Sequence, residues 1–315
     1  MRVLRVVRRA VVGLVVLLLL VLLVGAASTA WWTARAEDRW PPGGELLAVD
    51  GVDVHVRCRG EGPLVVLAHG VTGTTAEWEP LQDLAADRYR LCAVDRPGHG
   101  WSSRPDDAGL AAQADLFVDV AGQLSDEPAV LVGHSWAGQA LLLAGLDRPD
   151  EVAGLVLVAA VTHPEPGRPS APLYRAMQAP VLGPLLRRTV ATPFGRLNVD
   201  DELREAWAPQ TPPDEVVDRA RDLWPRPSQV DALTADALTD RSVLADRVDE
   251  YPDLQVPVAV VIGGADRVVD PDDHGLRLAH ELDAVTVVER PDVGHAVPEV
   301  APDAVLDGLD AVAGS

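Results

Sequence analysis

Lysine is absent from this 315-residue chain, and cysteine occurs only twice. Arginine therefore carries all of the fixed positive side-chain charge, and the net charge at pH 7 is −21. A chain this acidic repels the phosphate backbone of nucleic acids, so we expect no nucleic-acid partner. Histidine and cysteine show no metal-binding spacing, and the sequence therefore predicts neither a metal nor another cofactor.

The N-terminal segment differs from the rest of the chain in charge and hydropathy. No charged residue occurs from Ala10 to Ala34, a stretch longer than the ~20 residues that cross a bilayer core as a helix. Trp31 and Trp32 lie near its end, as in an interfacial aromatic belt. Four arginines precede the stretch and favour a cytoplasmic N-terminus: Arg2, Arg5, Arg8 and Arg9.

These features predict a single-pass cell-membrane anchor over residues 1–34, with the rest of the chain on the extracytoplasmic side. Residues 35–44 are charged and contain proline, and we expect them to form a short tether. The small residues from Gly25 to Ala30 are also compatible with a signal-peptide cleavage site, and cleavage there would make the protein secreted. The apolar core is longer than that of a usual signal peptide, which favours the uncleaved anchor.

Strand-like apolar runs alternate with helix-like stretches over most of residues 45–315. The first two runs, 46–49 and 52–57, flank Asp50-Gly51, a dipeptide typical of hairpin turns. The later runs alternate with helices, and this order predicts an α/β domain with a mostly parallel sheet covered on both faces. These later runs are 64–68, 90–94, 129–132, 152–160, 256–264 and 284–289.

The alternation of strands and helices is interrupted after His163. Twelve of the 26 prolines lie between Pro164 and Pro227, and proline interrupts regular helices. We therefore expect a helical cap at about residues 163–250, made of short helices and loops and inserted into the domain 45–315.

A serine lies between small residues at the end of a predicted buried strand. The pattern Gly133-His134-Ser135-Trp136-Ala137 is followed by a predicted helix. This strand–serine–helix arrangement is typical of a nucleophile elbow, in which small neighbours allow a strained turn. Alanine replaces the glycine that usually ends the pattern and adds one methyl group. The sequence therefore predicts Ser135 as a catalytic nucleophile.

A serine hydroxyl needs a base, and the base needs a group that orients it. His295 lies between the last predicted strand and the C-terminal helix, and Asp266 follows the strand 256–264. Both positions are at the carboxyl ends of strands, where Ser135 also lies. We expect Ser135, Asp266 and His295 to form a triad. Other acidic residues in the same loop are alternatives to Asp266: Asp270, Asp272 and Asp273.

With these residues the chain resembles the α/β-hydrolase superfamily from Leu46 to the C-terminus, apart from most of the cap. Three further stretches carry the resemblance: LAHGVTG (67–73), VDRPGHGWSS (94–103) and GHAVPEVAPDAV (294–305). The resemblance implies the α/β-hydrolase fold and the chain order Ser…Asp…His of its triad. It also implies an oxyanion hole formed by the backbone N–H groups of Val71 and Trp136.

The nucleophile type narrows the activity that the resemblance implies. Haloalkane dehalogenases and epoxide hydrolases on this fold place aspartate at the elbow, where this chain has Ser135. We therefore expect a serine hydrolase that cleaves a carboxylic ester or a related small-molecule acyl substrate. C–C bond hydrolases, iminopeptidase-like enzymes and perhydrolases are alternatives on the same triad. A binding or receptor module with little turnover is another, because fold alone does not fix function.

The cap contains several large side chains that could line a substrate pocket. We expect five of them to do so, and the alternative is that they only seat the cap on the sheet: Tyr174, Met177, Phe194, Trp207 and Trp224.

The two cysteines lie in strands that are neighbours in the fold that the chain resembles. In that fold, the strand containing Cys58 runs antiparallel to the strand containing Cys92, so that the two sulfurs come within bonding reach. An extracytoplasmic location would permit oxidation. The resemblance therefore implies a Cys58–Cys92 disulfide, and the alternative is two buried free thiols.

Overall fold

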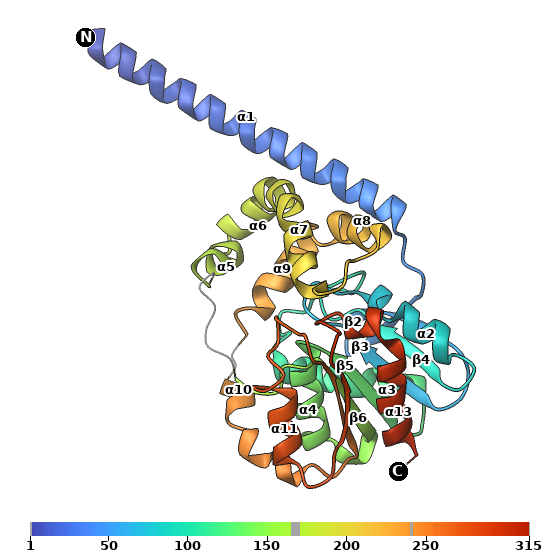
Figure 1. The fold of residues 1–315 in the computed structure, drawn as a ribbon. Coiled ribbons are helices and arrows are strands. Elements are labelled where there is room, and N and C mark those ends of the chain that lie inside the picture. Colours follow the sequence, from blue (N-terminus) through green and yellow to red (C-terminus); the bar gives the residue numbers. More distant parts are fainter. Residues whose placement is uncertain (1, 165–170, 240–241, 315) are drawn as a thin grey trace.

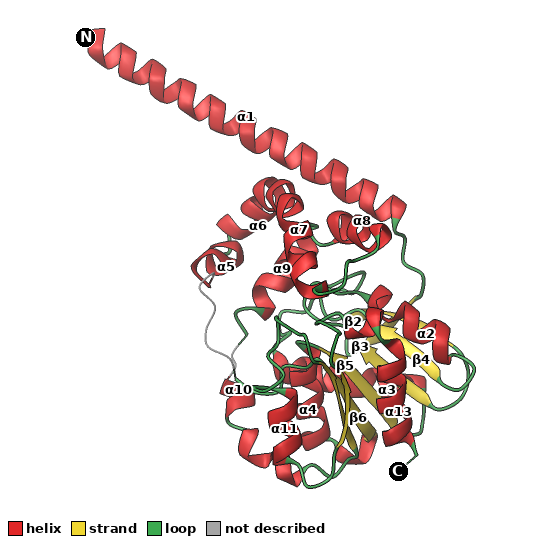
Figure 2. Cartoon of the chain, in the orientation of Figure 1, coloured by secondary structure: helices red, strands yellow, loops and turns green. Residues whose placement is uncertain are grey.

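The computed structural model describes residues 2–164, 171–239 and 242–314. These residues form a long N-terminal helix, a helical cap and an α/β domain (Figure 1). The main cap helices lie between the N-terminal helix and the sheet, as the colouring by secondary structure makes clear (Figure 2).

The N-terminal helix α1 spans Arg2–Arg39 and is long and apolar enough to cross a membrane. It continues five residues beyond the predicted anchor, so the predicted tether 35–44 is helical as far as Arg39. Alanine, arginine and glutamate in this extension are good helix formers. In addition, Arg39 forms ion pairs with Asp218 (2.6 Å) and Asp222 (3.0 Å) of the cap, which hold the end of the helix.

Eight strands form one mixed sheet in the order β1-β2-β4-β3-β5-β6-β7-β8. β2 pairs antiparallel with both β1 and β4, and all the other pairs are parallel. The strands are β1 (Glu45–Val49), β2 (Val52–Arg59), β3 (Leu64–Ala68), β4 (Arg90–Val94), β5 (Ala129–His134), β6 (Val152–Val158), β7 (Val258–Gly263) and β8 (Thr286–Arg290).

The turn between β1 and β2 has the geometry that its sequence predicts. Asp50 has φ 48° and Gly51 has φ 84°, so both residues are left-handed, as a two-residue type I′ hairpin requires.

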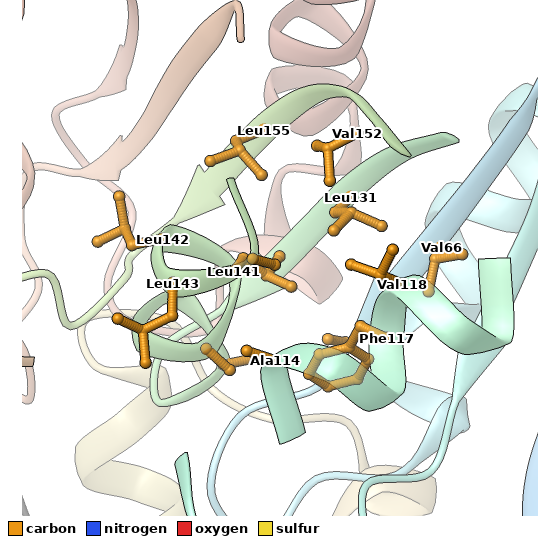
Figure 3. Packing of buried hydrophobic residues seen from close by; sticks show 14 of the residues in the cluster. Val66, Ala114, Phe117, Val118, Leu131, Leu141, Leu142, Leu143, Val152 and Leu155 are labelled. Atoms are coloured by element: carbon orange, nitrogen blue, oxygen red, sulfur yellow. The ribbon is translucent and has the colours of Figure 1, made fainter. Parts of the chain in front are cut away.

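Buried strand residues alternate between two cores, one on each face of the sheet. Val66 belongs to the same core as Phe117 and Leu141, on the face covered by α3 and α4 (Figure 3). Val65 belongs to the core on the other face, which α2 and α13 cover. The helical segments of this domain are η1 (Thr75–Trp78), α2 (Glu79–Ala85), α3 (Leu110–Leu124), α4 (Ala137–Asp147), η2 (Pro149–Glu151), α11 (Gly275–Glu281), α12 (Val297–Val300) and α13 (Pro302–Ala313).

The cap is helical, but one of its helices is longer than the proline content predicts. α7 runs for 16 residues because its proline, Pro193, lies in the first turn, where the missing N–H costs nothing. The described helices between β6 and β7 are α5 (Ala171–Gln178), α6 (Leu182–Leu186), the π-helical turn η3 (Arg187–Ala191), α7 (Thr192–Trp207), α8 (Asp214–Leu223), α9 (Pro227–Asp236), α10 (Ser242–Ala245) and η4 (Val248–Asp253).

Candidate active site

Ser135 lies in a strained turn between β5 and α4. Its φ is 52°, a left-handed value that is uncommon for a residue with a side chain. Its N–H donates to the carbonyl of Val158 (3.0 Å), and its carbonyl accepts from Val161 (3.0 Å), so the end of β6 and the segment after it hold both sides of the turn. A methyl group on Gly133 would lie 2.6 Å from Leu141 Cδ1, so a larger residue at that position would force the Leu141 side chain to shift. The small residues around Ser135 and the hydrogen bonds to its backbone thus hold the turn that carries the serine hydroxyl.

The structure brings Ser135, His295 and Asp266 into one hydrogen-bonded line. His295 Nε2 lies 2.9 Å from Ser135 Oγ, and His295 Nδ1 lies 2.7 Å from Asp266 Oδ2. The other carboxylate oxygen of Asp266 accepts N–H groups from Val268 (2.8 Å) and Val269 (3.0 Å), which fix its orientation. These are the contacts that a nucleophile, a base and an orienting acid need.

Of the acidic residues in the loop after β7, Asp266 is the one that contacts His295. Asp270 instead accepts an N–H from Asp272 (2.9 Å), two residues further along the same loop. The choice of Asp266 over its neighbours therefore has a geometric basis, while its role in catalysis stays a prediction.

The loop after β3 lies directly against the serine turn. A methyl group on Gly70 would lie 3.0 Å from the Cβ of Ser135, so the glycine permits this close approach. The next residue, Val71, and the residue after the serine, Trp136, both line the cavity above Ser135. Their positions suit the two predicted oxyanion-hole donors, whose role stays a prediction.

Arg96 links these two segments to the cap. Its guanidinium donates to the carbonyls of His69 (3.0 Å) and Gly70 (3.1 Å) and stacks on Trp136, 4.3 Å from the ring centroid. It also donates to the carboxylate of Asp236 (2.8 Å) in α9. Arg96 and Asp236 are both fully buried or nearly so. Sequence reasoning missed Arg96, because its partners lie far away along the chain.

A second histidine, His134, lies beside His295, with 4.7 Å between the ring centroids. Its Nδ1 donates to Glu77 (2.8 Å), and its Nε2 donates to the backbone carbonyl of His295 (3.0 Å). Burial lowers the pKa of His134, but the carboxylate of Glu77 outweighs this and raises that pKa to about 9. A proton on both ring nitrogens is consistent with the two donated hydrogen bonds.

The pKa of His295 shifts in the opposite direction to that of His134. Burial lowers the pKa of His295 below its usual value, and the positive charge of His134 lowers it further. Asp266 and Glu77 act against this, but they do not reverse it. A neutral His295 can accept the proton of Ser135, so the site has an available base at neutral pH.

A cavity of about 780 Å³ lies above the triad, between the sheet and the cap. Of the five predicted pocket residues, Tyr174, Trp207 and Trp224 line it. The structure does not place the other two at the cavity: Met177 is not among its lining residues, and Phe194 is 63% exposed on the surface of the cap.

The helical repeat of α7 explains why Phe194 points outward. The buried residues of α7 include Val199, Leu203 and Trp207, which recur every four residues and form its inner face. Phe194 precedes Val199 by five residues, about 140° around the helix. In α8, a spacing of four and then three residues marks lining residues that sequence reasoning missed: Val216, Ala220 and Leu223.

The lining of the cavity combines apolar side chains with an excess of acidic ones. Seven carboxyl groups and two guanidinium groups line it. Burial raises the pKa of Glu299 to about 8, and repulsion from Glu77 adds to this effect. Among the described residues, no group of histidine, cysteine, aspartate and glutamate side chains could hold a metal ion. The carboxyl groups are Glu77, Glu79, Asp83, Glu202, Glu205, Glu215 and Glu299, and the guanidinium groups are Arg219 and Arg267.

The comparison with known families agrees with this geometry. A family model described as the alpha/beta hydrolase fold matches residues 63–302. The chain belongs to the α/β-hydrolase fold family. The chain is similar to 2-(acetamidomethylene)succinate hydrolase of Mesorhizobium japonicum, with 30% identity over 269 residues, 82% of this chain and 90% of the relative.

Solved structures of the family superpose on most of the chain. An α/β hydrolase fold protein from Burkholderia ambifaria has a TM-score of 0.72 at 24% identity, covering 84% of this chain and 96% of that one. A membrane phospholipase A, described as a bacterial virulence factor, has a TM-score of 0.67 at 23% identity. That match covers 98% of this chain and 100% of the other. At these identities the structural likeness shows the fold.

Proposed function

We propose that the chain is a membrane-anchored serine hydrolase that cleaves a carboxylic ester through an acyl-enzyme on Ser135. The observation that carries this proposal is the line Ser135–His295–Asp266, with its two hydrogen bonds of 2.9 and 2.7 Å. The apolar helix α1 supports the anchoring.

In the proposed reaction, Ser135 Oγ attacks the ester carbonyl carbon while His295 Nε2 takes the hydroxyl proton. Asp266 holds the imidazolium that forms. The N–H groups of Val71 and Trp136 stabilise the oxyanion, a contribution of about 3 kcal/mol for each donor in comparable sites. His295 then returns the proton to the alcohol as the carbon–oxygen bond breaks. A water molecule then attacks the acyl carbon while His295 takes one of its protons. The bond to Ser135 Oγ breaks, the acid leaves, and His295 returns the proton to Ser135.

The charges around the cavity favour a particular class of ester. The lining carries seven carboxyl groups, of which Glu299 is mostly protonated at neutral pH, against two guanidinium groups and the cationic His134. A polyanionic substrate would still meet net repulsion. The name of the Mesorhizobium japonicum relative contains a succinate, which is a dicarboxylate. We propose that this chain differs from that relative in substrate charge, because its acidic lining would repel a dicarboxylate. Its substrate is then an uncharged or cationic ester, with its apolar part against Trp207 and Trp224.

A panel of p-nitrophenyl esters with graded acyl chains tests the reaction. Wild type should hydrolyse members of the panel, and Ser135→Ala should lose nearly all of this activity while keeping its circular dichroism spectrum. Asp266→Asn should lower kcat on the order of 10³–10⁴-fold, because the base loses the acceptor that orients it.

Asp270→Asn is the matched control for Asp266→Asn, since Asp270 lies in the same loop without contacting His295. It should retain wild-type activity. A fully active Asp266→Asn together with an inactive Asp270→Asn would show that the acid is assigned wrongly. Undiminished hydrolysis by Ser135→Ala would refute the proposed reaction.

A further inference from the structure

One segment of the cap departs from the acidic character of the chain. Residues 171–199 contain four arginines and no aspartate or glutamate, whereas the whole chain has 48 acidic and 27 basic residues. We call this stretch of α5, α6, η3 and the first half of α7 the basic cap segment. Its arginines are Arg175, Arg187, Arg188 and Arg196.

The arginines of the basic cap segment fall into two groups. Arg187 pairs with Asp231 (2.9 Å), and Arg196 pairs with Asp222 (3.1 Å) and stacks on Trp32 of α1. Arg175 and Arg188 are exposed to solvent. Two cations are therefore available to bind an anionic surface.

The same segment exposes large apolar side chains. Val181 is 85% exposed and Leu197 is 75% exposed, which is unusual for a cap whose inner face is well packed. Apolar side chains interspersed with arginines are typical of segments that lie in a membrane interface. The other exposed apolar residues of the segment are Leu173, Leu182, Leu185 and Phe194.

The basic cap segment contacts α1 inside the uncharged stretch of that helix. A methyl group on Gly25 would overlap the backbone carbonyl of Thr189 in η3, so the two backbones touch. Thr29, one turn further along α1, is buried. Figure 1 shows α5 and α6 on the side of the cap toward which the N-terminal half of α1 extends.

The position of Gly25 sets the depth of this contact. About 20 helical residues span the hydrocarbon core of a bilayer. Within the uncharged stretch, such a span can run from 10–29 to 15–34, and Gly25 lies inside it in every case. In the shallowest placement Gly25 is four residues, or about 6 Å, below the edge of the core. Thr189 must then lie at a similar depth.

We propose that the basic cap segment is seated in the headgroup and outer acyl region of an anionic bilayer, beside α1. This rests on the proposed anchoring by α1 and adds a second, peripheral contact with the membrane. Val181, Leu197 and their apolar neighbours insert between acyl chains, and Arg175 and Arg188 pair with lipid phosphates. Tyr174, in the same segment, lines the cavity, so the cap wall over the triad lies at the lipid surface.

Fluorescent probes at single cysteines in the full chain test the proposal. Both native cysteines are in a disulfide, so an introduced thiol can be labelled alone. We would label Val181→Cys and Leu197→Cys with an environment-sensitive fluorophore and reconstitute the protein in phosphatidylcholine–phosphatidylglycerol vesicles. Both probes should show blue-shifted emission that is quenched by lipids with a nitroxide near the headgroup. A probe at Val287→Cys, a matched exposed valine on β8, should report water.

A probe at Leu18→Cys, in the middle of the uncharged stretch, distinguishes a failure of the anchoring by α1 from a failure of the seating of the cap. If the Leu18 probe is quenched while the Val181 and Leu197 probes report water, α1 is inserted and the seating of the cap is refuted. If the Leu18 probe also reports water, the anchoring fails, and the seating of the cap fails with it. Cross-linking of two chains through Val181→Cys, without lipid quenching, would identify a second copy as the occupant and overturn the proposal.

Two pairs of variants test the contacts that carry the argument. Gly25→Leu should lift the cap from α1 and reduce quenching of the Val181 probe, whereas Gly13→Leu, where a side chain meets nothing within 4 Å, should not. Arg175→Gln with Arg188→Gln should reduce quenching in anionic vesicles and not in pure phosphatidylcholine. Unchanged quenching in both Gly25→Leu and the double arginine variant would contradict the proposed seating.

Discussion

His134 and His295 are neighbours with opposite protonation states. His134 is held as a cation by Glu77, and its charge contributes to the lowered pKa of His295. A histidine can act as a base only in its neutral form, so the pair keeps His295 ready to accept a proton. Glu77 and His134 are 57 residues apart, and no local pattern in the sequence indicates that they meet.

This arrangement predicts the acid limb of the pH–rate profile. Since the pKa of His295 is lowered, the acid limb of kcat/KM should have its midpoint below 6.5, the usual pKa of histidine. His134→Gln removes the positive charge and should move the acid limb to higher pH, because the cationic form of His295 is then less disfavoured. His280→Gln, on the exposed side of α11, is the control and should leave the limb in place. An acid limb that does not move in His134→Gln would argue against this coupling.

At the scale of elements, one buried ion pair ties the cap to the sheet. Arg96 follows β4, and Asp236 ends α9, and His99 also contacts the Asp236 carboxylate (3.0 Å). Burial lowers the pKa of Arg96. Burial also acts to raise the pKa of Asp236, but Arg96, His99 and Arg104 together outweigh it and lower that pKa. Breaking one partner of such a pair leaves an uncompensated charge in the interior.

Arg96→Met should therefore destabilise the protein by about 3–5 kcal/mol, measured as the free energy of unfolding in urea. Adding Asp236→Leu should recover much of this loss, because no buried charge then remains unpaired. Arg104→Met is the matched control, since Arg104 is partly exposed and 3.5 Å from the same carboxylate, and its effect should be small. A double variant no more stable than Arg96→Met would contradict this account.

The strands β2 and β4 are joined covalently at one position. Cys58 and Cys92 are directly opposed in the antiparallel register, with their Cα atoms 4.0 Å apart, and they form a disulfide in the structure. The bond closes a loop with a sequence separation of 34, and this loop contains β3 and the segment with Val71.

Removing this disulfide should lower the free energy of unfolding by about 3–4 kcal/mol in the chain-entropy model. The comparison is between wild type and Cys58→Ala/Cys92→Ala, with reduced wild type expected to match the double variant. Thiol counting on denatured, unreduced protein should find no free thiol. Two free thiols per chain, in protein purified from its native compartment, would show that the bond does not form there.

The strands were predictable from the sequence to a degree that the cap was not. The bounds of β3 and β4 agree with the predicted runs 64–68 and 90–94. A short apolar run between polar residues in an α/β protein usually forms a buried strand, because it is too short for a helix. In the cap, the aromatic residues within 171–236 indicated that some side chains line a substrate pocket, but not which of them face it. Phe194 and Trp207 lie in one helix, and only packing decides which of them faces the cavity.

At the scale of the whole molecule, the cap lies between α1 and the sheet (Figure 1). The cavity lies between the cap and the sheet. The sequence predicted the apolar helix as a separate segment, and it predicted the placement of Ser135, Asp266 and His295 at strand ends. It could not predict that Gly25 touches Thr189 or that Arg96 reaches Trp136, because both contacts join residues far apart in the chain. Such contacts depend on the tertiary fold.

The central claim is that Ser135 is an activated nucleophile, and covalent labelling tests it most directly. The full chain would be treated with a fluorophosphonate, which reacts with serines activated by a base, and its intact mass and peptide masses would then be measured. We predict one adduct per chain, mapped to Ser135, with none in Ser135→Ala and much slower labelling in His295→Ala. Absence of an adduct in folded wild type, or equal labelling of Ser135→Ala, would contradict the account.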